Sequence, residues 1–178
     1  MTTDATLGHV ASTDLFGGTV AEAMERSATL SPCRAYRYAL WRRWGRGPYA
    51  MFIGLNPSTA DETNDDPTIR RCIAFARAWG YEALCMTNLF AYRATNPADL
   101  KKTSEPIGWG NDRTLRDLAP GAGVVVAAWG AGGSYLRRSD SVRLMVPGLH
   151  YLRLTKDGHP GHPLYLPANL EPQPWVNW

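Results

Sequence analysis

The fold is decided by the stretch Tyr49-Ala-Met-Phe-Ile-Gly-Leu-Asn-Pro-Ser58. Its first seven residues form an apolar run without helical periodicity, which is typical of a strand buried on both faces of a sheet. The run ends at Asn56-Pro57, because proline fixes its own φ and excludes the preceding residue from the helical region. A polar loop therefore leaves the carboxyl end of a buried strand. Such a loop is either an ordinary connection to a helix or part of the edge where open α/β sheets bind ligands.

Three later segments repeat the pattern of a buried strand followed by a polar or glycine-rich loop. They are residues 83–90, 123–129 and 150–154. Helical signals lie between the strands. The clearest is Asp66-Pro67, an N-cap followed by proline at the first position of a helix that runs to Trp79. Further helices are expected over 111–118 and 134–145. This alternation predicts an α/β fold, a three-layer sandwich around a central, mainly parallel four-stranded sheet.

The chain before these strands carries weaker signals. Residues 33–44 are rich in aromatic side chains, which favours a strand, and residues 45–48 supply a turn into the next strand. An antiparallel hairpin is therefore expected to precede the sheet. Residues 1–30 are small and polar, with only a short helical possibility around residues 20–27. The sequence thus predicts a poorly defined N-terminal segment, 1–30, and a single α/β domain, 31–178.

Composition points to one domain that works inside the cell. The 178 residues are 44% hydrophobic, which is enough for one core. Most basic residues are arginine, which suits phosphate binding but is also what a coding bias gives. Three cysteines without a CxxC pair indicate reduced thiols. No apolar run reaches the length of a membrane span and the N-terminus does not resemble a signal peptide, so we expect a cytoplasmic protein with no membrane partner.

Four strand-end loops are expected to converge, because the carboxyl ends of parallel strands meet at the same edge of a sheet. These loops carry Asn56, Asn88, Gly130 and His162. Gly130 opens a glycine-rich loop that suits a phosphate, although the lysine of a P-loop is missing. His159 and His162 have no third ligand near them in the sequence, so no metal ion is expected.

Four motifs stand in order at the ends of the predicted strands: Gly54-Leu-Asn-Pro-Ser58, Thr87-Asn-Leu-Phe-Ala-Tyr-Arg93, Val124-Val-Val-Ala-Ala-Trp-Gly130 and His162-Pro-Leu-Tyr-Leu166. Together they resemble the uracil-DNA glycosylase superfamily, in particular a bacterial and phage branch with an LNPSTAD…HPLYL signature. The resemblance covers about residues 49–167 and implies a glycosylase-like domain. It also implies a monofunctional DNA glycosylase, which hydrolyses the bond between base and sugar and leaves an abasic site. DNA is then the partner, with no cofactor and no obligate protein partner. An iron–sulfur cluster is not expected, because four cysteines are lacking.

The resemblance assigns roles to the residues that match the motifs of the family. Asn56 stands where the family positions the attacking water, and Asn88 stands where it reads the Watson–Crick edge of the pyrimidine. His162 stands where a hydrogen-bond donor meets the pyrimidine oxygen that gains negative charge. Leu164 and Tyr165 follow it and are the candidates for insertion into the DNA helix.

The chemistry of the reaction adds a carboxylate to this set. A neutral amide such as Asn56 cannot act as a strong base. A carboxylate of the same loop is therefore expected to contribute, and Asp61 and Asp66 are the catalytic candidates among the four acidic residues there.

The remaining candidates bind the substrate base or the DNA backbone. Phe90 and Tyr92 are stacking partners for an extruded base, although packing in the core is the more ordinary role for Phe90. Arg93 ends the second motif and is grouped with them. The backbone at Gly130 suits a contact with a DNA phosphate.

One position departs from the family pattern and widens the expected substrate range. Uracil-restricted relatives have a tyrosine that blocks 5-substituted pyrimidines where this chain has Ser58. The expected substrate is uracil or an enlarged pyrimidine such as the hydroxymethylated or glucosylated cytosine of phage DNA, in repair or in antiviral defence. Two other classes stay open. One is a module that binds modified bases without cleaving them, which the neutral Asn56 favours, and the other is a hydrolase or transferase of free nucleosides or nucleotides.

Overall fold

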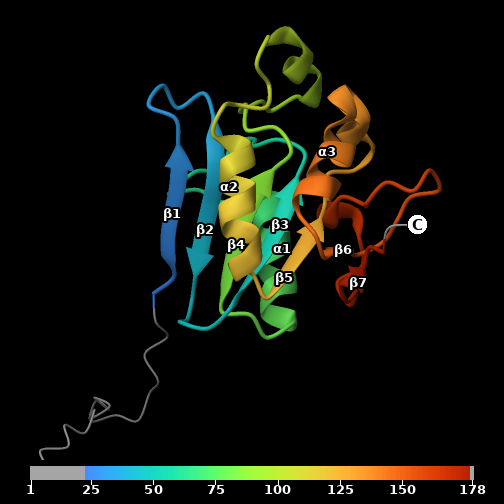
Figure 1. Cartoon of the computed structure of the whole chain (residues 1–178). Coiled ribbons are helices and arrows are strands. Elements are labelled where there is room, and N and C mark those ends of the chain that lie inside the picture. Colours follow the sequence, from blue (N-terminus) through green and yellow to red (C-terminus); the bar gives the residue numbers. More distant parts are fainter. Residues whose placement is uncertain (1–22, 177–178) are drawn as a thin grey trace, which may run out of the picture.

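The apolar run that begins at Tyr49 forms the central strand of the sheet. A computed structural model describes residues 23–176 and shows a seven-stranded mixed sheet in the order β1-β2-β4-β3-β5-β6-β7 (Figure 1). The strands are β1 (Glu25–Leu30), β2 (Arg37–Arg43), β3 (Tyr49–Gly54), β4 (Ala83–Asn88), β5 (Val124–Ala127), β6 (Leu149–Tyr151) and β7 (Gln173–Pro174). The α-helices are α1 (Pro67–Ala78), α2 (Asn111–Leu118) and α3 (Arg138–Met145). The 3₁₀ helices are η1 (Pro97–Lys102), η2 (Ala119–Gly121), η3 (Ala131–Arg137) and η4 (Pro163–Tyr165).

The predicted α/β class is confirmed, but the size and composition of the sheet were predicted wrongly. The four expected strands are neighbours and run parallel in the order β4-β3-β5-β6. Three further strands, β1, β2 and β7, add antiparallel pairs at the two sides. The sheet is therefore seven-stranded and mixed, and is not the four-stranded parallel core expected of a uracil-DNA glycosylase-like fold.

An antiparallel hairpin does precede the parallel strands, but its two strands are not the ones predicted. β2 does not pair with β3, because β4 occupies that side of β3; β2 pairs instead with β4 and with β1. The partner in the hairpin, β1, lies in the segment 1–30 that the sequence set apart, so the sheet extends into that segment. Residues 25–27 of the expected helical stretch belong to this strand. Residues 1–22, including the start of that stretch, lie outside the described part of the chain.

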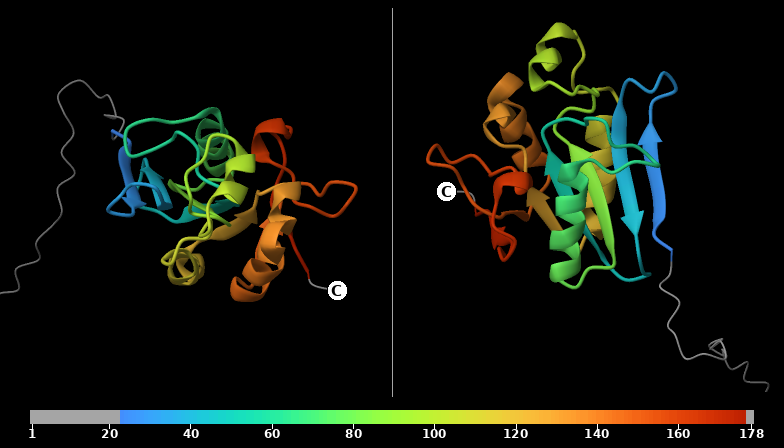
Figure 2. Two further views of the ribbon diagram at one scale, coloured as in Figure 1. Left: turned by 90° about the horizontal axis from the view of Figure 1, so that it is seen from above. Right: turned by 180° about the vertical axis from the view of Figure 1, so that it is seen from behind.

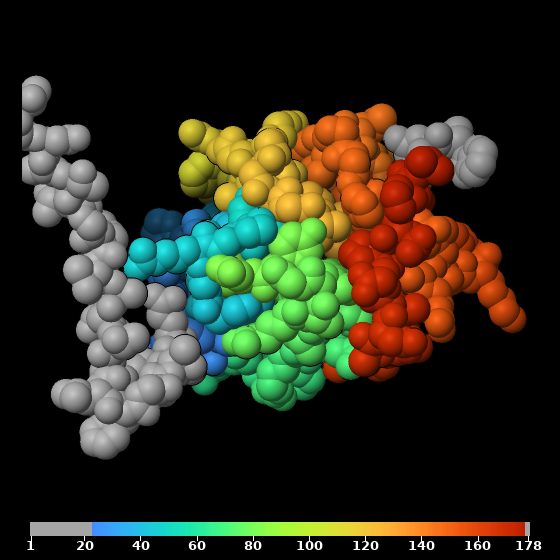
Figure 3. Space-filling view, turned by 90° about the horizontal axis from the view of Figure 1, so that it is seen from below, coloured from blue at the N-terminus to red at the C-terminus, as the bar shows by residue number. Residues whose placement is uncertain are grey.

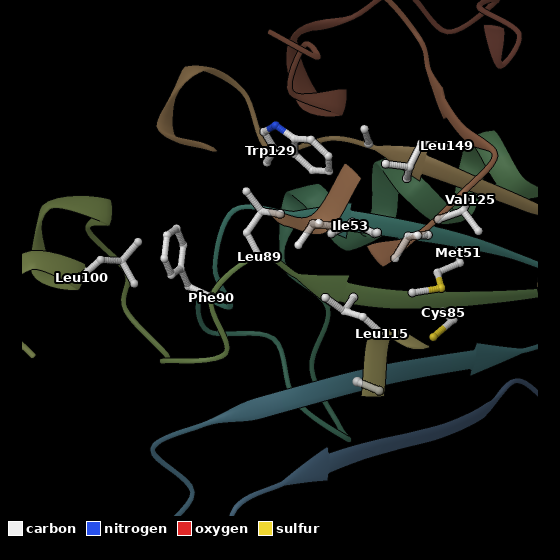
Figure 4. Close-up of a cluster of buried hydrophobic side chains, with 14 residues drawn as sticks. Met51, Ile53, Cys85, Leu89, Phe90, Leu100, Leu115, Val125, Trp129 and Leu149 are labelled. Atoms are coloured by element: carbon white, nitrogen blue, oxygen red, sulfur yellow. The ribbon is translucent and has the colours of Figure 1, made fainter. Parts of the chain in front are cut away.

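The two faces of the sheet are covered by different helices, as the alternation along β3 requires. Met51 and Ile53 point to the face covered by α2 and α3 and pack in one buried cluster with Leu115 (Figure 4). Ala50 and Phe52 point to the other face and pack against α1. The views in Figures 1 and 2 show α1 behind the sheet and α2 in front of it. The sheet is thus the middle of three layers.

Two of the three expected α-helices begin where they were predicted, one of them at a capping signal, and the third begins later. Asp66 accepts a hydrogen bond from the backbone N–H of Ile69 at 2.8 Å, and Pro67 begins α1 as predicted. α2 spans the predicted residues. α3 begins only at Arg138, four residues later than expected, because Leu136 and Arg137 have φ of 52° and 51° and interrupt the helical path.

The C-terminal segment lies along α1. The guanidinium of Arg71 donates to the backbone carbonyl of Leu166, and the indole N–H of Trp79 donates to the carbonyl of Leu170 at 3.0 Å. Figure 3 shows this segment in red beside the green helix. The contact fixes η4, which carries the last predicted motif. Among residues 23–176, no helix is both long and apolar enough to span a membrane.

A buried arginine ties the loop after β3 to the β1–β2 hairpin. Arg42 is fully buried, and its Nε donates to the carboxylate of Asp65 at 2.7 Å. Its Nη2 donates to the backbone carbonyls of Asp61 at 2.5 Å and Asn64 at 3.2 Å. Arg26 reaches the second oxygen of Asp65 at 2.8 Å. Because a buried guanidinium needs these acceptors, the loop is held in one position.

We therefore expect Asp65→Ala to lower the free energy of unfolding by about 3 kcal/mol, since it leaves the buried charge of Arg42 without its carboxylate. Urea denaturation of both proteins measures the difference. The control is Asp117→Ala, which removes the exposed ion pair with Arg113 and should change stability by less than about 0.5 kcal/mol. Equal losses in the two variants would show that the buried pair does not hold the loop.

Candidate functional site

A cavity of about 410 Å³ opens at the carboxyl ends of β3, β4 and β5. The chain leaves β3 toward β4 on one side, whereas β5 lies on the other side of β3, so the strand order reverses at this point. Such a reversal leaves a crevice where α/β proteins bind ligands. The view from above in Figure 2 looks onto this edge. Seven of the expected site residues line the cavity: Asn56, Ser58, Asp66, Asn88, His162, Leu164 and Tyr165.

The amide of Asn56 is held with its oxygen available to a ligand. Its Nδ2 donates to the backbone carbonyl of Ala94 at 2.7 Å and to that of Pro57 at 3.1 Å. Two carbonyls on the same side require the nitrogen there, so the amide cannot be reversed. Asn56 therefore presents a hydrogen-bond acceptor, which suits a water molecule or a ligand N–H.

The side chain of Asn88 lies over Gly54, directly across the β3–β4 pairing. A Cβ at Gly54 would lie 2.8 Å from Nδ2 of Asn88 and 2.6 Å from Cε of Met86, so only glycine leaves room for this amide. The backbone there is held by Asn111, whose Nδ2 donates to the carbonyls of Asn88 at 3.0 Å and Leu89 at 2.9 Å. The first motif therefore has glycine at position 54 because a side chain there would displace the amide of Asn88.

Arg37 is a cavity residue that the sequence analysis missed. It is 2% exposed, and its Nη1 donates to the carbonyl of Ala60 at 2.7 Å, while Nη2 donates to Oδ1 of Asn88 at 3.3 Å. Burial lowers its pKa to about 10, against the opposing effect of the Asp66 carboxylate. It remains a cation at neutral pH. The position of Arg37 in the sequence could have indicated this role. Arg37 is the first residue of β2, and because β2 runs antiparallel to β4, it begins at the edge where the parallel strands end.

Asp66 supplies the carboxylate among the described residues that line the cavity. One of its oxygens caps α1, and the other makes no hydrogen bond with residues 23–176. His162 accepts a weak hydrogen bond at Nδ1 from the backbone N–H of Leu164, 3.4 Å away, which leaves the proton of the neutral ring on Nε2. Burial lowers the pKa of His162, and Asp66 opposes that shift. The imidazole is therefore a neutral donor.

Apolar side chains stand exposed at the rim of the cavity. Tyr165 is 81% exposed and Leu164 is 38% exposed, although both line the opening. The ring of Tyr165 lies 5.5 Å from that of His162, centroid to centroid. The side chains of Tyr165 and Leu164 are therefore both accessible to a molecule that enters the cavity.

Asp61, one of the two proposed catalytic carboxylates, is turned away from the cavity. Its Oδ1 accepts hydrogen bonds from the backbone and side chains of Thr63 and Asn64, at 2.9 to 3.2 Å. These bonds, the one from the Thr63 backbone first, lower the pKa of Asp61 far below its usual range. The Asp61 carboxylate is thus engaged within its own loop, and Asp66 is the one of the two catalytic candidates that lines the cavity.

Four other expected residues are not among the cavity residues. Phe90 is fully buried in the core, which leaves no surface for stacking on a base. Tyr92 packs edge-on against Tyr36 at 5.7 Å, and Arg93 donates to the backbone carbonyl of Arg34 at 3.3 Å. Gly130 donates its backbone N–H to the carbonyl of Pro160 at 2.9 Å and has a positive φ of 67°. The aromatic residues that do line the cavity are Trp129, His162 and Tyr165.

The described part of the chain holds no cluster of three or more metal-ligating side chains. Its three cysteines, Cys33, Cys72 and Cys85, are free thiols. The polar groups of the cavity that could act on a ligand are the acceptor amide of Asn56, the donor imidazole of His162, the carboxylate of Asp66 and the buried guanidinium of Arg37.

The fold and the cavity define an α/β protein with a preformed cavity at the point where its strand order reverses. Residues 37–164 match the model of a family described as protein of unknown function, DUF1643, and the chain belongs to that family. The matched region runs from Arg37 to Leu164 and so contains nearly the whole cavity lining. Comparison with curated proteins and with solved structures gave no match.

The electrostatics of the cavity give a titration test. We expect NMR to place the pKa of His162 below about 6.5, its value in an unfolded chain, because burial favours the neutral ring. The contribution of His162 to stability is then complete above that value and is lost as the pH falls through it toward the folded pKa. The pKa of His162 in the chain unfolded by urea serves as the reference.

The variant Asp66→Asn sharpens this test, because asparagine caps a helix as well as aspartate does. Removing the carboxylate should lower the pKa of His162 further, since Asp66 raises it. An unchanged or higher value in the folded variant would show that the two groups do not interact.

Proposed function

We propose that the protein is a DNA glycosylase that hydrolyses the N-glycosidic bond of an altered pyrimidine. The observation that supports this best is convergence: Asn56, Asn88 and His162, from three distant parts of the chain, line one cavity of about 410 Å³. That volume is within the range of pockets that hold small ligands. These are the three residues whose places in the motifs carry the resemblance to uracil-DNA glycosylases.

The imidazole meets the main demand of the reaction. Cleavage of the bond passes through an oxocarbenium-like sugar while the base departs with negative charge. Donors held in place at that charge are the most effective stabilisers. His162 is half-buried and neutral, and its free N–H supplies such a donor without the cost of a buried imidazolium.

The second demand is a water molecule on the other side of the sugar. Asn56 offers its amide oxygen to orient that water, and Asp66 offers a carboxylate oxygen to which no residue of the described chain donates. The negative charge of Asp66 would also stabilise the positive sugar. In this proposal Asn56 orients the nucleophile and Asp66 supplies the charge that an amide lacks.

DNA fits the rim of the cavity better than a free nucleoside does. Tyr165 and Leu164 are exposed beside the opening, where a duplex from which the base has been flipped out would cover them. The cost of flipping is a few kcal/mol, which such contacts offset. The proposed setting is the cytoplasm, where thiols such as those of the free cysteines stay reduced.

A binding module for modified bases is the second candidate. The observation that favours it is that Asp66 already caps α1 with one oxygen and so has an evident structural use. An excision assay separates the two functions. Duplexes that contain uracil or 5-substituted pyrimidines are incubated with the protein and then heated in alkali, which breaks the strand at abasic sites.

We expect cleavage with the native protein and a loss of about 10² to 10³-fold in the rate with His162→Ala, because one fixed donor at the developing charge is removed. Asn56→Ala should also abolish most cleavage. His159→Ala, in the same loop but outside the cavity, is the matched control and should keep the full rate. If His162→Ala or Asn56→Ala folds and cleaves at the native rate, the catalytic role assigned to that residue is wrong.

Ser58 gives a test of substrate size. Ser58→Tyr should fill the part of the cavity that a 5-substituent would occupy. Excision of 5-hydroxymethyl pyrimidines should then fall at least about tenfold relative to excision of uracil from the same DNA sequence. The ratio of the two rates is the measurement, since a general loss of activity leaves it constant. An unchanged ratio would place the 5-position elsewhere.

A further inference from the structure

The guanidinium of Arg37 decides how the neighbouring amide is oriented. It is 2% exposed and is fixed by its bond to the carbonyl of Ala60, 2.7 Å away. Its Nη2 lies 3.3 Å from Oδ1 of Asn88. A guanidinium has only donors, so the amide can face it only with its oxygen. The nitrogen of Asn88 is thereby turned the other way.

The position of that nitrogen is equally constrained. Nδ2 of Asn88 lies against Gly54, where an added Cβ would be 2.8 Å from it, and Gly54, Met86 and Asn88 all line the cavity. No side chain of the described residues uses it as a donor, because the hydrogen bond of this amide to Arg37 is made by Oδ1. The N–H groups of this nitrogen are therefore available to an acceptor on a ligand in the cavity.

We propose that Arg37 is a positioning residue that fixes the amide of Asn88 with its nitrogen toward the cavity, so that the site selects a base with a carbonyl oxygen there. The preferred substrate is then a 4-oxo pyrimidine, uracil or a 5-substituted uracil. A 4-amino pyrimidine, such as a 5-substituted cytosine, would set its N–H against that of Asn88. This inference rests on the proposed function, and it distinguishes two substrate classes that the open slot at Ser58 does not.

The charge of Arg37 makes the preference insensitive to pH across the neutral range. With a pKa of about 10 the guanidinium stays protonated, helped by the carboxylate of Asp66. A protonated guanidinium never accepts, so reversing the amide would place two sets of N–H groups face to face. The orientation therefore holds before a ligand arrives.

The test compares single-stranded oligonucleotides that contain 5-hydroxymethyluracil or 5-hydroxymethylcytosine in one sequence context, which removes differences in base pairing. Excision of the two bases is measured with the native protein, Arg37→Met and Arg37→Lys. The native protein should prefer the 4-oxo base at least about tenfold, since a buried donor facing a donor is a loss of that order. Arg37→Met should reduce the preference to within about threefold. Arg37→Lys should retain it, because an ammonium still donates to Oδ1.

A readout that needs no ligand separates this inference from the proposed function. The side-chain amide protons of Asn88 should give a nuclear Overhauser effect to the Hα protons of Gly54 in the native protein and in Arg37→Lys. The effect should weaken in folded Arg37→Met, where the amide is free to turn.

The combined outcomes decide between the two. If the effect behaves as expected but no base is excised, the positioning role stands and the glycosylase proposal fails. If bases are excised but Arg37→Met keeps both the effect and the 4-oxo preference, the positioning role is wrong. A native protein that prefers the 4-amino base would overturn the inference directly.

Discussion

Everything at the site depends on the pairing of one strand with two parallel neighbours. In that register Gly54 lies beside Asn88 and Ile53 lies beside Ala127, so the three strands end together. The chain therefore leaves all three strands at the same edge of the sheet. The cavity lies at that edge. Its residues come from distant parts of the chain because the pairing is parallel, and each parallel connection needs a helix to return.

This constraint explains which parts of the fold the sequence could predict. Strands buried on both faces and helices with a capping signal such as Asp66-Pro67 are encoded within a few residues, and they were predicted nearly to their ends. β1 and β7 were missed, because they are short or largely exposed and have no apolar pattern of their own. The partner of β2 is a matter of long-range competition, since β4 displaces it from β3. The late start of α3 follows from two residues with positive φ, neither of them glycine.

The candidate site could be predicted in part for the same reason. Residues at the carboxyl ends of neighbouring parallel strands had to meet, and Asn56 and Asn88 do. Which carboxylate of the loop faces the cavity could not be read from spacing, because four lie within six residues. The neighbouring arginines decide it: Arg42 and Arg26 bind Asp65, and Arg34 binds Glu62. Asp61 is used by its own loop, which leaves Asp66.

The charges around the cavity are arranged so that its donors stay fixed. Arg37 is buried and remains a cation, whereas burial keeps His162 neutral even though Asp66 draws a proton toward it. Were His162 charged, its attraction to Asp66 would compete with any ligand, and a buried imidazolium would need a partner of its own. Under the proposed reaction the developing negative charge would meet donors already in position. Asp66 supports the cation of Arg37, and its second oxygen, which makes no hydrogen bond with residues 23–176, is the one that could act on the sugar in the proposed reaction. In the proposed reaction, the Asp66 carboxylate would thus have two roles. It would stabilise the charge of Arg37, which orients Asn88, and it would stabilise the positive sugar. Its hydrogen bond at the start of α1 matters because that bond fixes the carboxylate in the cavity wall.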